Sequence, residues 1–186
     1  MAATYSYRPS LIGPAWQFEL TDTGLAWRIG GSHGLWPYAS IARIRLSFRP
    51  SSMQARRFRA DIRNDQGRTL TVISVSWQTA SLAAAQDLPY RAFVTQLHAR
   101  IAQADGRPVL IAGVTRPVYL AGLIALVLVN LALVALFVRA AITAAWAGML
   151  FLAGFAALFG WKVGGMLARN RPRAYRLDDL PRDLLP

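Results

Sequence analysis

The chain lacks cysteine and is poor in histidine, lysine and acidic residues. Of its 186 residues none is Cys, His33 and His98 are the two histidines, Lys162 is the single lysine, and nine are Asp or Glu. Without thiols the chain holds no disulfide framework, thiolate metal site, iron–sulfur cluster or cysteine nucleophile. Two imidazoles exclude a three-histidine zinc site, and the few carboxylates leave little material for acid–base catalysis.

Catalytic and cofactor-binding motifs are also lacking. The sequence contains no G-x-S-x-G, P-loop, dinucleotide-binding glycine pattern, HExxH or paired-carboxylate motif. The glycine-rich segment 30–34, GGSHG, lacks the length and the following lysine of a phosphate-binding loop. We therefore expect a protein that is not an enzyme and that uses no metal or cofactor.

Long apolar runs are present, in a chain with a net charge of +12 and 54% hydrophobic residues. Two runs without a charge, Pro117–Val138 and Ala140–Trp161, have 22 residues each. At about 1.5 Å per residue each is long enough for a hydrocarbon core of about 30 Å. The sequence predicts a transmembrane hairpin, with helices over 117–138 and 145–167 and a turn over 139–144. The alternative is a pair of buried helices in a soluble bundle.

Basic residues flank the outer ends of this hairpin. Arg107 and Arg116 lie in a predicted linker, residues 105–116, and the turn contributes only Arg139. The basic residues that follow the second run are Lys162, Arg169, Arg171, Arg173 and Arg176. By the positive-inside rule both termini are expected in the cytoplasm, with the turn facing outward.

Small residues recur along the second span, where they let helix backbones approach closely. The candidate helix-packing residues are Gly148, Gly154, Ala156, Gly160, Gly164 and Ala168. Their partner is either the first span or another membrane protein.

Asn130 is the strongly polar side chain near the middle of the first span. Lipid offers it no hydrogen-bond partner, so we expect it to bond a backbone carbonyl beside Gly154, within the stretch 151–154 of the second span, or a polar group of a partner protein. A channel or transporter component would need oligomers lined by Asn130.

The region before the linker shows strand signals separated by turn residues. Six short strands are expected, over 16–20, 25–29, 35–41, 41–48, 57–63 and 69–77. Turns are expected at 21–24, 30–34 and 64–67, and a loop at 49–55. A helix capped by Asp87 follows, with one apolar face that includes Phe93 and Leu97. His98 lies beside that face, where a partly buried packing role is favoured over a ligand role.

Arginines alternate with apolar residues on two neighbouring strands, which predicts one basic outward face. Its members are Arg43, Arg45, Arg49, Arg57, Arg59 and Arg63. A solvated face is the default interpretation, because Asp61 can compensate only part of the set. The functional interpretation is contact with the anionic cytoplasmic leaflet or with an acidic partner. No nucleic-acid-binding motif accompanies the charge.

The strands and helix together resemble a pleckstrin-homology-like (PH-like) domain. The resemblance rests on FELTDTGLAWRI, PYASIARIRLSFRP, RRFRADIRNDQGRTLTVISVSW and YRAFVTQLHARI. The chain is similar to uncharacterised bacterial membrane proteins that pair such a domain with transmembrane helices. The resemblance implies an α+β fold, an antiparallel β-barrel or sandwich over residues 14–104 capped by one C-terminal helix, in the bacterial inner membrane. Lipid-binding forms of the domain carry a basic first hairpin, whereas segment 21–24 here holds Asp22 and no cation.

Residues 1–13 are expected to be an N-terminal arm, and 168–186 a basic, proline-containing cytoplasmic tail that is either an extended recognition segment or a disordered end. The leading functional hypothesis is a non-catalytic accessory or scaffold subunit that binds other integral membrane proteins, with homo-oligomers possible and no nucleic-acid partner. The alternative is a membrane-anchored sensor of anionic lipid headgroups that uses the basic sheet face.

Overall fold

The computed structural model describes residues 3–10, 12–49, 57–78 and 83–186. The chain forms two compact units. The sheet unit comprises residues 1–113 and 173–186, and the helix hairpin comprises residues 114–172. The sheet unit is therefore interrupted in sequence by the hairpin, and its last residues follow the second long helix.

Four antiparallel strands form the first sheet, in the order of the chain. They are β1 (Ala3–Tyr7), β2 (Trp16–Leu20), β3 (Gly24–Ile29) and β4 (Ser32–Pro37). A Cβ atom at Gly24 would lie 2.3 Å from the carbonyl oxygen of Trp36, so β3 passes β4 too closely there for any other residue. The strand after the second turn begins at Ser32, earlier than predicted, and ends in a short 3-10 helix, Tyr38–Ser40.

A five-stranded mixed sheet follows, in the order β11-β10-β5-β6-β7. Its strands are β5 (Ile41–Phe48), β6 (Phe58–Asn64), β7 (Thr69–Ile73), β10 (Val109–Ala112) and β11 (Arg173–Ala174). β10 runs parallel to β5 and the other pairs are antiparallel. The predicted strand 69–77 is broken at Ser74, whose Oγ accepts a hydrogen bond from the Phe58 amide at 3.0 Å. The predicted loop 49–55 lies, beyond Arg49, outside the described residues.

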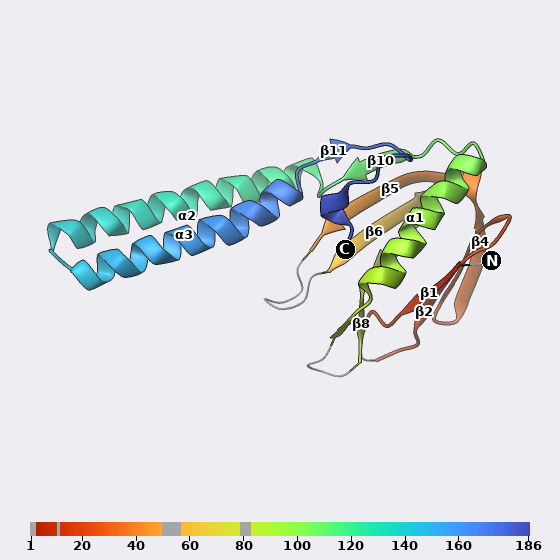
Figure 1. The fold of residues 1–186 in the computed structure, drawn as a ribbon, viewed down its shortest axis with the longest axis horizontal. Coiled ribbons are helices and arrows are strands. Elements are labelled where there is room, and N and C mark those ends of the chain that lie inside the picture. Colours follow the sequence, from red (N-terminus) through yellow and green to blue (C-terminus); the bar gives the residue numbers. More distant parts are fainter. Residues whose placement is uncertain (1–2, 11, 50–56, 79–82) are drawn as a thin grey trace. The chain divides into compact units, whose positions relative to one another are not determined.

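Residues after the break pair as a small third sheet, β8 (Val75–Trp77) with β9 (Ala83–Ala85). Helix α1 (Asp87–Gln103) then crosses one face of the sheets (Figure 1). Gln86, not Asp87, is its N-cap residue, and no side-chain cap bond forms there. Asp87 is instead the acidic residue of the first turn, where a carboxylate favours the helix dipole.

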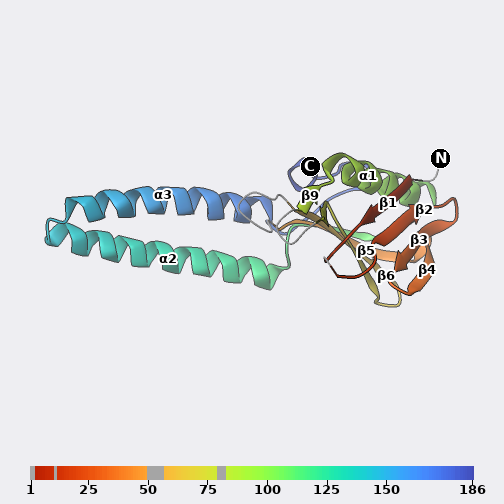
Figure 2. The same ribbon diagram turned by 90° about the horizontal axis from the view of Figure 1, so that it is seen from below.

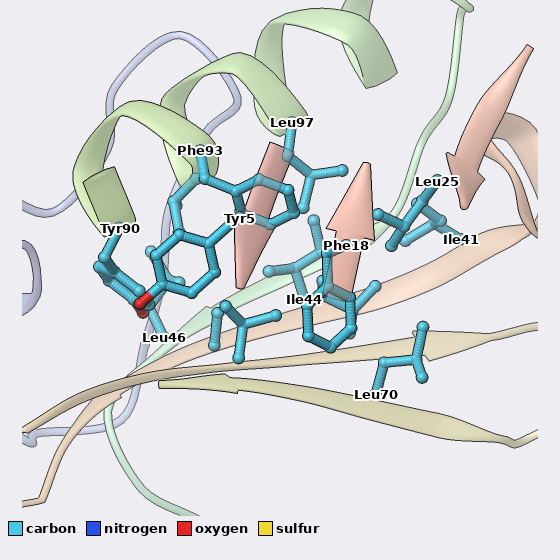
Figure 3. Close-up of a cluster of buried hydrophobic side chains, with 14 of the residues drawn as sticks. Tyr5, Phe18, Leu25, Ile41, Ile44, Leu46, Leu70, Tyr90, Phe93 and Leu97 are labelled. Atoms are coloured by element: carbon cyan, nitrogen blue, oxygen red, sulfur yellow. The ribbon is translucent and has the colours of Figure 1, made fainter. Parts of the chain in front are cut away.

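The core of the sheet unit lies between α1 and the inner faces of the two larger sheets. Figure 3 shows Tyr90, Phe93 and Leu97 of α1 directed at Tyr5 and Phe18 from the first sheet. The Phe93 ring centroid lies 5.5 Å from that of Tyr5 and 6.3 Å from that of Phe18. The apolar face predicted for the helix is therefore the face that is buried.

Two tyrosines of β1 join the first sheet to the edge of the second. The Tyr5 hydroxyl donates to the carbonyl oxygen of Ile73 at 2.6 Å, and the Tyr7 hydroxyl donates to that of Thr71. These bonds replace a backbone ladder between β1 and β7, so the described strands form an open α+β arrangement and not a closed barrel. The predicted N-terminal arm is thus part of the core through β1.

The helix hairpin consists of α2 (Arg116–Ile142) and α3 (Trp146–Arg169), which run antiparallel side by side in both views (Figures 1 and 2). Both helices are longer than the predicted spans. α2 buries no residue and α3 buries only Leu167. Their apolar surfaces are consequently exposed almost throughout, and no other part of the described chain covers them as a soluble bundle would.

The segment after α3 returns to the sheet unit. β11 pairs with β10, and Leu184, in the short helix Arg182–Leu184, is fully buried in the core. The disordered-end interpretation of the tail is therefore wrong: residues 173–186 complete the hydrophobic core. The predicted linker 105–116 likewise contains a sheet strand, β10.

Candidate functional site

The register of β5 and β6 sets which arginines share the outer face of the five-stranded sheet. Arg43 lies opposite Arg63, Arg45 opposite Asp61, and Ser47 opposite Arg59. The intervening residues of both strands, among them Ile44 and Ile62, are fully buried. We call this outer surface the arginine face. All four arginines of β5 and β6 lie on it: Arg43, Arg45, Arg59 and Arg63.

The single carboxylate of the arginine face is already occupied. Asp61 accepts two hydrogen bonds from the Nε of Arg59, at 2.8 and 3.0 Å, and one from the Thr71 hydroxyl at 2.7 Å. Arg59 and Asp61 therefore neutralise each other. Arg45, directly opposite Asp61, makes no hydrogen bond to it.

Arg43 and Arg45 form no ion pair among the described residues, although the charge of Asp61 raises the pKa of Arg45. The Nε atom of each is shielded from solvent and has no hydrogen-bond partner among the described residues. Burial lowers the pKa of Arg45, and the neighbouring charge of Arg43 lowers that pKa further. Like charges that share a strand face raise each other's free energy unless an anion or water screens them.

The remaining arginines separate along the sheet. The guanidinium of Arg63 folds over the turn after β6, with its Nη2 atom 3.2 Å from where a Cβ atom of Gly67 would lie. Arg49 and Arg57 sit at the other end of the strand pair, where the Arg49 amide donates to the Arg57 carbonyl at 2.8 Å. Burial lowers the pKa of Arg57, with Arg59 and Arg49 adding to the effect. The structure thus places Arg63 opposite Arg43 in the register, but directs its guanidinium over the turn.

The predicted helix-packing residues behave differently from one another. Gly148 lies near the side chains of Ala145 and Ala140, whereas a Cβ atom at Gly154, Gly160 or Gly164 would meet nothing within 4 Å. The remaining two divide by exposure: Ala156 is half-buried and Ala168 exposed. The close glycine contact that sequence reasoning missed is Gly122 of α2, against Leu167. Its signal was its place on the stripe of α2 that also holds Asn130.

Asn130 bonds within its own helix. Its amide nitrogen donates to the carbonyl oxygen of Leu126 at 2.7 Å, so the predicted bond to a carbonyl beside Gly154 is wrong. The contacts of Gly122 with Leu167 and of Ala140 with Gly148 fix the antiparallel register of the helices. That register sets Asn130 near the middle of the helix pair, level with residues around 159 and not with 151–154. An amide hydrogen bond to the preceding turn costs the helix little and needs no second chain.

His98 is buried and ties the tail to α1. Its Nδ1 lies 2.7 Å from the Val94 carbonyl oxygen, which can only accept, so Nδ1 carries the proton. Its Nε2 then accepts from the Tyr175 hydroxyl at 2.8 Å. Burial lowers the pKa of His98. The packing role predicted for His98 fits this geometry, while its tail partner, 77 residues away, had no local sequence signal.

Two open hollows mark the sheet unit. One, of about 660 Å³, lies between α1, β10 and the tail and is lined mainly by apolar groups such as Ala99, Leu110 and Leu177. The other, of about 410 Å³, lies on the outer face of the first sheet beside Glu19 and His33. Among the described residues no group of three or more His, Cys, Asp or Glu side chains could hold a metal ion.

Comparison with known proteins gives no relative: no family model, no curated protein and no solved structure matches the chain.

Proposed function

We propose that this chain is an integral membrane protein of the bacterial inner membrane, anchored by α2 and α3, with the sheet unit in the cytoplasm. The helices have 27 and 24 residues and high mean hydropathy, and none of their apolar windows is buried. At about 1.5 Å per residue both exceed the thickness of a hydrocarbon core. The flanking arginines support the orientation with both termini inside.

We further propose a non-catalytic accessory or scaffold role, in which the hairpin packs against another integral membrane protein and a PH-like sheet unit contacts it in the cytoplasm. The observation that carries this proposal is that the hairpin is inserted between two paired strands. β10 ends at Ala112 and α2 begins at Arg116, while α3 ends at Arg169 and β11 begins at Arg173.

Each connection is therefore three residues long. A fully extended chain places the Cα atoms of Ala112 and Arg116 at most about 14 Å apart. A domain on one flexible linker samples a wide volume, but two short connections limit how far the sheet unit can move from the hairpin. That double attachment raises the local concentration of the sheet unit for a membrane-embedded partner.

The helix surface that supports a membrane partner is the small-residue surface of α3. Gly160 and Gly164 are half-buried, but an added Cβ atom would meet nothing within 4 Å at either residue. Small residues at this spacing allow another helix to approach closely in lipid, where hydrophobicity itself drives no association. A second copy of the chain is one such partner.

The test is the mass of the particle purified from its own membrane in mild detergent. We expect the wild-type chain, 20.4 kDa, to emerge in a larger particle of fixed composition. The double variant Gly160→Leu with Gly164→Leu blocks close approach and should release a single chain. Ala132→Leu adds the same bulk to the exposed surface of α2 and is the matched control. Recovery of the wild-type chain as a monomer would contradict the proposal.

A further inference from the structure

We propose that protonation of His98 releases the tail, residues 173–186, from α1, so that the sheet unit contains a pH-sensitive latch. The latch is the hydrogen bond from the Tyr175 hydroxyl to Nε2 of His98, at 2.8 Å. His98 and the tail both belong to the sheet unit. The release therefore depends on contacts within that unit alone.

The two hydrogen bonds of His98 require a neutral imidazole. Nδ1 donates to the Val94 carbonyl oxygen at 2.7 Å, and the lone pair of Nε2 accepts from Tyr175. A proton on Nε2 turns this acceptor into a donor. The Tyr175 oxygen could then accept only by turning its own hydrogen away, and the hydroxyl has no other hydrogen-bond partner among the described residues. Protonation therefore breaks the latch as it stands.

A protonated His98 also lacks a counter-charge. Its side chain is 1% exposed, and an unpaired charge is costly in such a place. Burial lowers the pKa of His98, and the hydrogen bond with the Val94 carbonyl is the effect that opposes this. The imidazolium is consequently disfavoured for as long as the tail is docked.

The elements packed against α1 supply no acid that compensates His98. β1 and β10 contain no charged residue, and in the tail Asp178 and Asp183 pair with Arg176 and Arg173. The tyrosines of these elements, Tyr175 among them, stay neutral because burial raises their pKa. The remaining charged residues of α1, the tail and β2, none of which contributes to the pKa shift of His98, are Glu19, Asp87, Arg91, Arg100, Asp179 and Arg182.

The tail is held at few points, so the loss of one bond matters. β11 forms two residue pairs with β10, Leu184 is buried in the core, and one exposed hydrogen bond reaches Pro186 from α1. Between Tyr175 and Leu184, the side chains of Leu177 and Leu180 line the open hollow of about 660 Å³ beside α1. A segment with so few contacts opens at a lower free energy than the whole unit unfolds.

Release of the tail changes how the sheet unit is connected to the hairpin. While β11 is paired with β10, three residues separate α3 from the sheet. With the tail free, the sheet unit keeps only the connection from β10 to α2. Protonation of His98 thus converts a double attachment into a single one. The importance of this change for a membrane anchor rests on the proposed function, whereas the release itself does not.

The test is amide hydrogen exchange of the full natural chain in mild detergent at pH 7.5 and pH 5.0, read peptide by peptide. The intrinsic exchange rate at each pH, divided by the observed rate, gives the protection factor. The imidazole of a released tail has a pKa of about 6.5, so protection of the tail should fall by up to about thirtyfold between the two pH values. The peptide that contains β6 should stay better protected than the tail at both.

Two results would overturn the proposal. The same tail protection at both pH values would show that His98 does not govern release. Equal protection of the tail and β6 would show that the tail leaves only when the whole unit unfolds. The measurement needs no membrane, so a failure of the proposed anchoring leaves its outcome unaffected.

Substitution of each histidine separates the latch from other titrating groups. His98→Gln keeps a side chain that can accept from Tyr175 but cannot become charged, so the pH dependence of tail protection should disappear. His33→Gln removes the other imidazole of the chain, which is exposed on β4, and should keep the full dependence. Persistence of the dependence in His98→Gln would assign it to other groups and contradict the proposal.

A second measurement leaves His98 in place. In the natural chain labelled at histidine, NMR follows protonation of both imidazoles, and the spectrum of His33→Gln assigns their signals. Tail protection should begin to decline near pH 6.5 and should level off at the pH at which His98 of the folded chain is protonated. A decline that begins only below about pH 5, where carboxylates titrate, would refute the latch.

Discussion

The sheet unit and the helix hairpin place apolar side chains in opposite ways. The sheet unit encloses its aromatic residues, with Tyr90 fully buried and Phe93 2% exposed. The hairpin leaves Phe151 70% and Trp161 78% exposed, although its composition is the more apolar. Burial within the chain stabilises the first unit, whereas the apolar surface of the second is left uncovered by the described chain. Aromatic side chains are thus buried in one unit and exposed in the other, and the residue type alone does not predict which.

Truncation of one aromatic residue in each unit should give the largest difference between the two units. Phe93→Ala removes a ring packed between Tyr5 and Phe18 and should destabilise the sheet unit by about 3–5 kcal/mol. Phe151→Ala, in α3, removes an exposed ring and should leave the sheet unit unchanged. Amide hydrogen exchange of the full chain in detergent, read peptide by peptide, measures both. Equal losses in the two variants would contradict the division into units.

A smaller effect is expected where the tail joins the core. Tyr175→Phe removes the donor to the buried Nε2 of His98, which should cost about 1–3 kcal/mol because the acceptor is left unpaired. Urea unfolding at pH 8 measures the loss. Tyr119→Phe, in the hairpin, is the control for loss of a hydroxyl group, and a similar cost there would show that the effect is not specific to His98.

His98 also gives the sheet unit a pH dependence that the hairpin lacks. Burial lowers the folded-state pKa below the unfolded value of about 6.5, so the neutral imidazole is favoured in the fold. Its contribution is present above pH 6.5 and is lost as the pH falls through the folded pKa. The wild-type sheet unit should therefore lose stability between pH 7 and pH 5. A His98→Gln variant with the same slope would assign the pH dependence to other groups.

The smallest effect concerns the outer face of the five-stranded sheet. Arg43→Gln removes one of two facing cations and should raise the free energy of unfolding of the sheet unit by about 0.2–1 kcal/mol in uncharged detergent at low salt. High salt should erase the gain. Arg28→Gln provides the control on the other sheet. A loss of stability in Arg43→Gln would mean that the cation has a compensating partner.

Local sequence patterns predicted the parts of the fold that rest on local contacts. Alternation along β5 and β6 predicted both strands and the shared side of their arginines, because side-chain direction follows the strand period. The helical period likewise predicted α1. β1 carries the same signal, with Tyr5 and Tyr7 alternating with Thr4 and Ser6, which the expectation of an N-terminal arm over residues 1–13 did not take into account.

The parts that escaped prediction depend on contacts between distant residues. β10 and β11 have four and two residues, and the whole hairpin separates them in the sequence. Neither strand is long enough to show the alternation of apolar and polar residues that predicts a strand. Asp61 was recognised as a partial counter-charge, but its engagement by Arg59 and Thr71 depends on rotamers. The Asn130 amide donates to the Leu126 carbonyl oxygen, one turn away in the same helix, so it needs no hydrogen-bond partner from another helix.

The pairing of β10 with β11 also has a consequence for the order of folding. During synthesis from the N-terminus, the ribosome makes β10 before both long helices, and makes β11 and Leu184 after them. The sheet therefore lacks its edge strand, and the core lacks Leu184 and the tyrosine that meets His98, until the hairpin has been completed. Completion of the sheet unit thus requires that both helices of the hairpin have already been made.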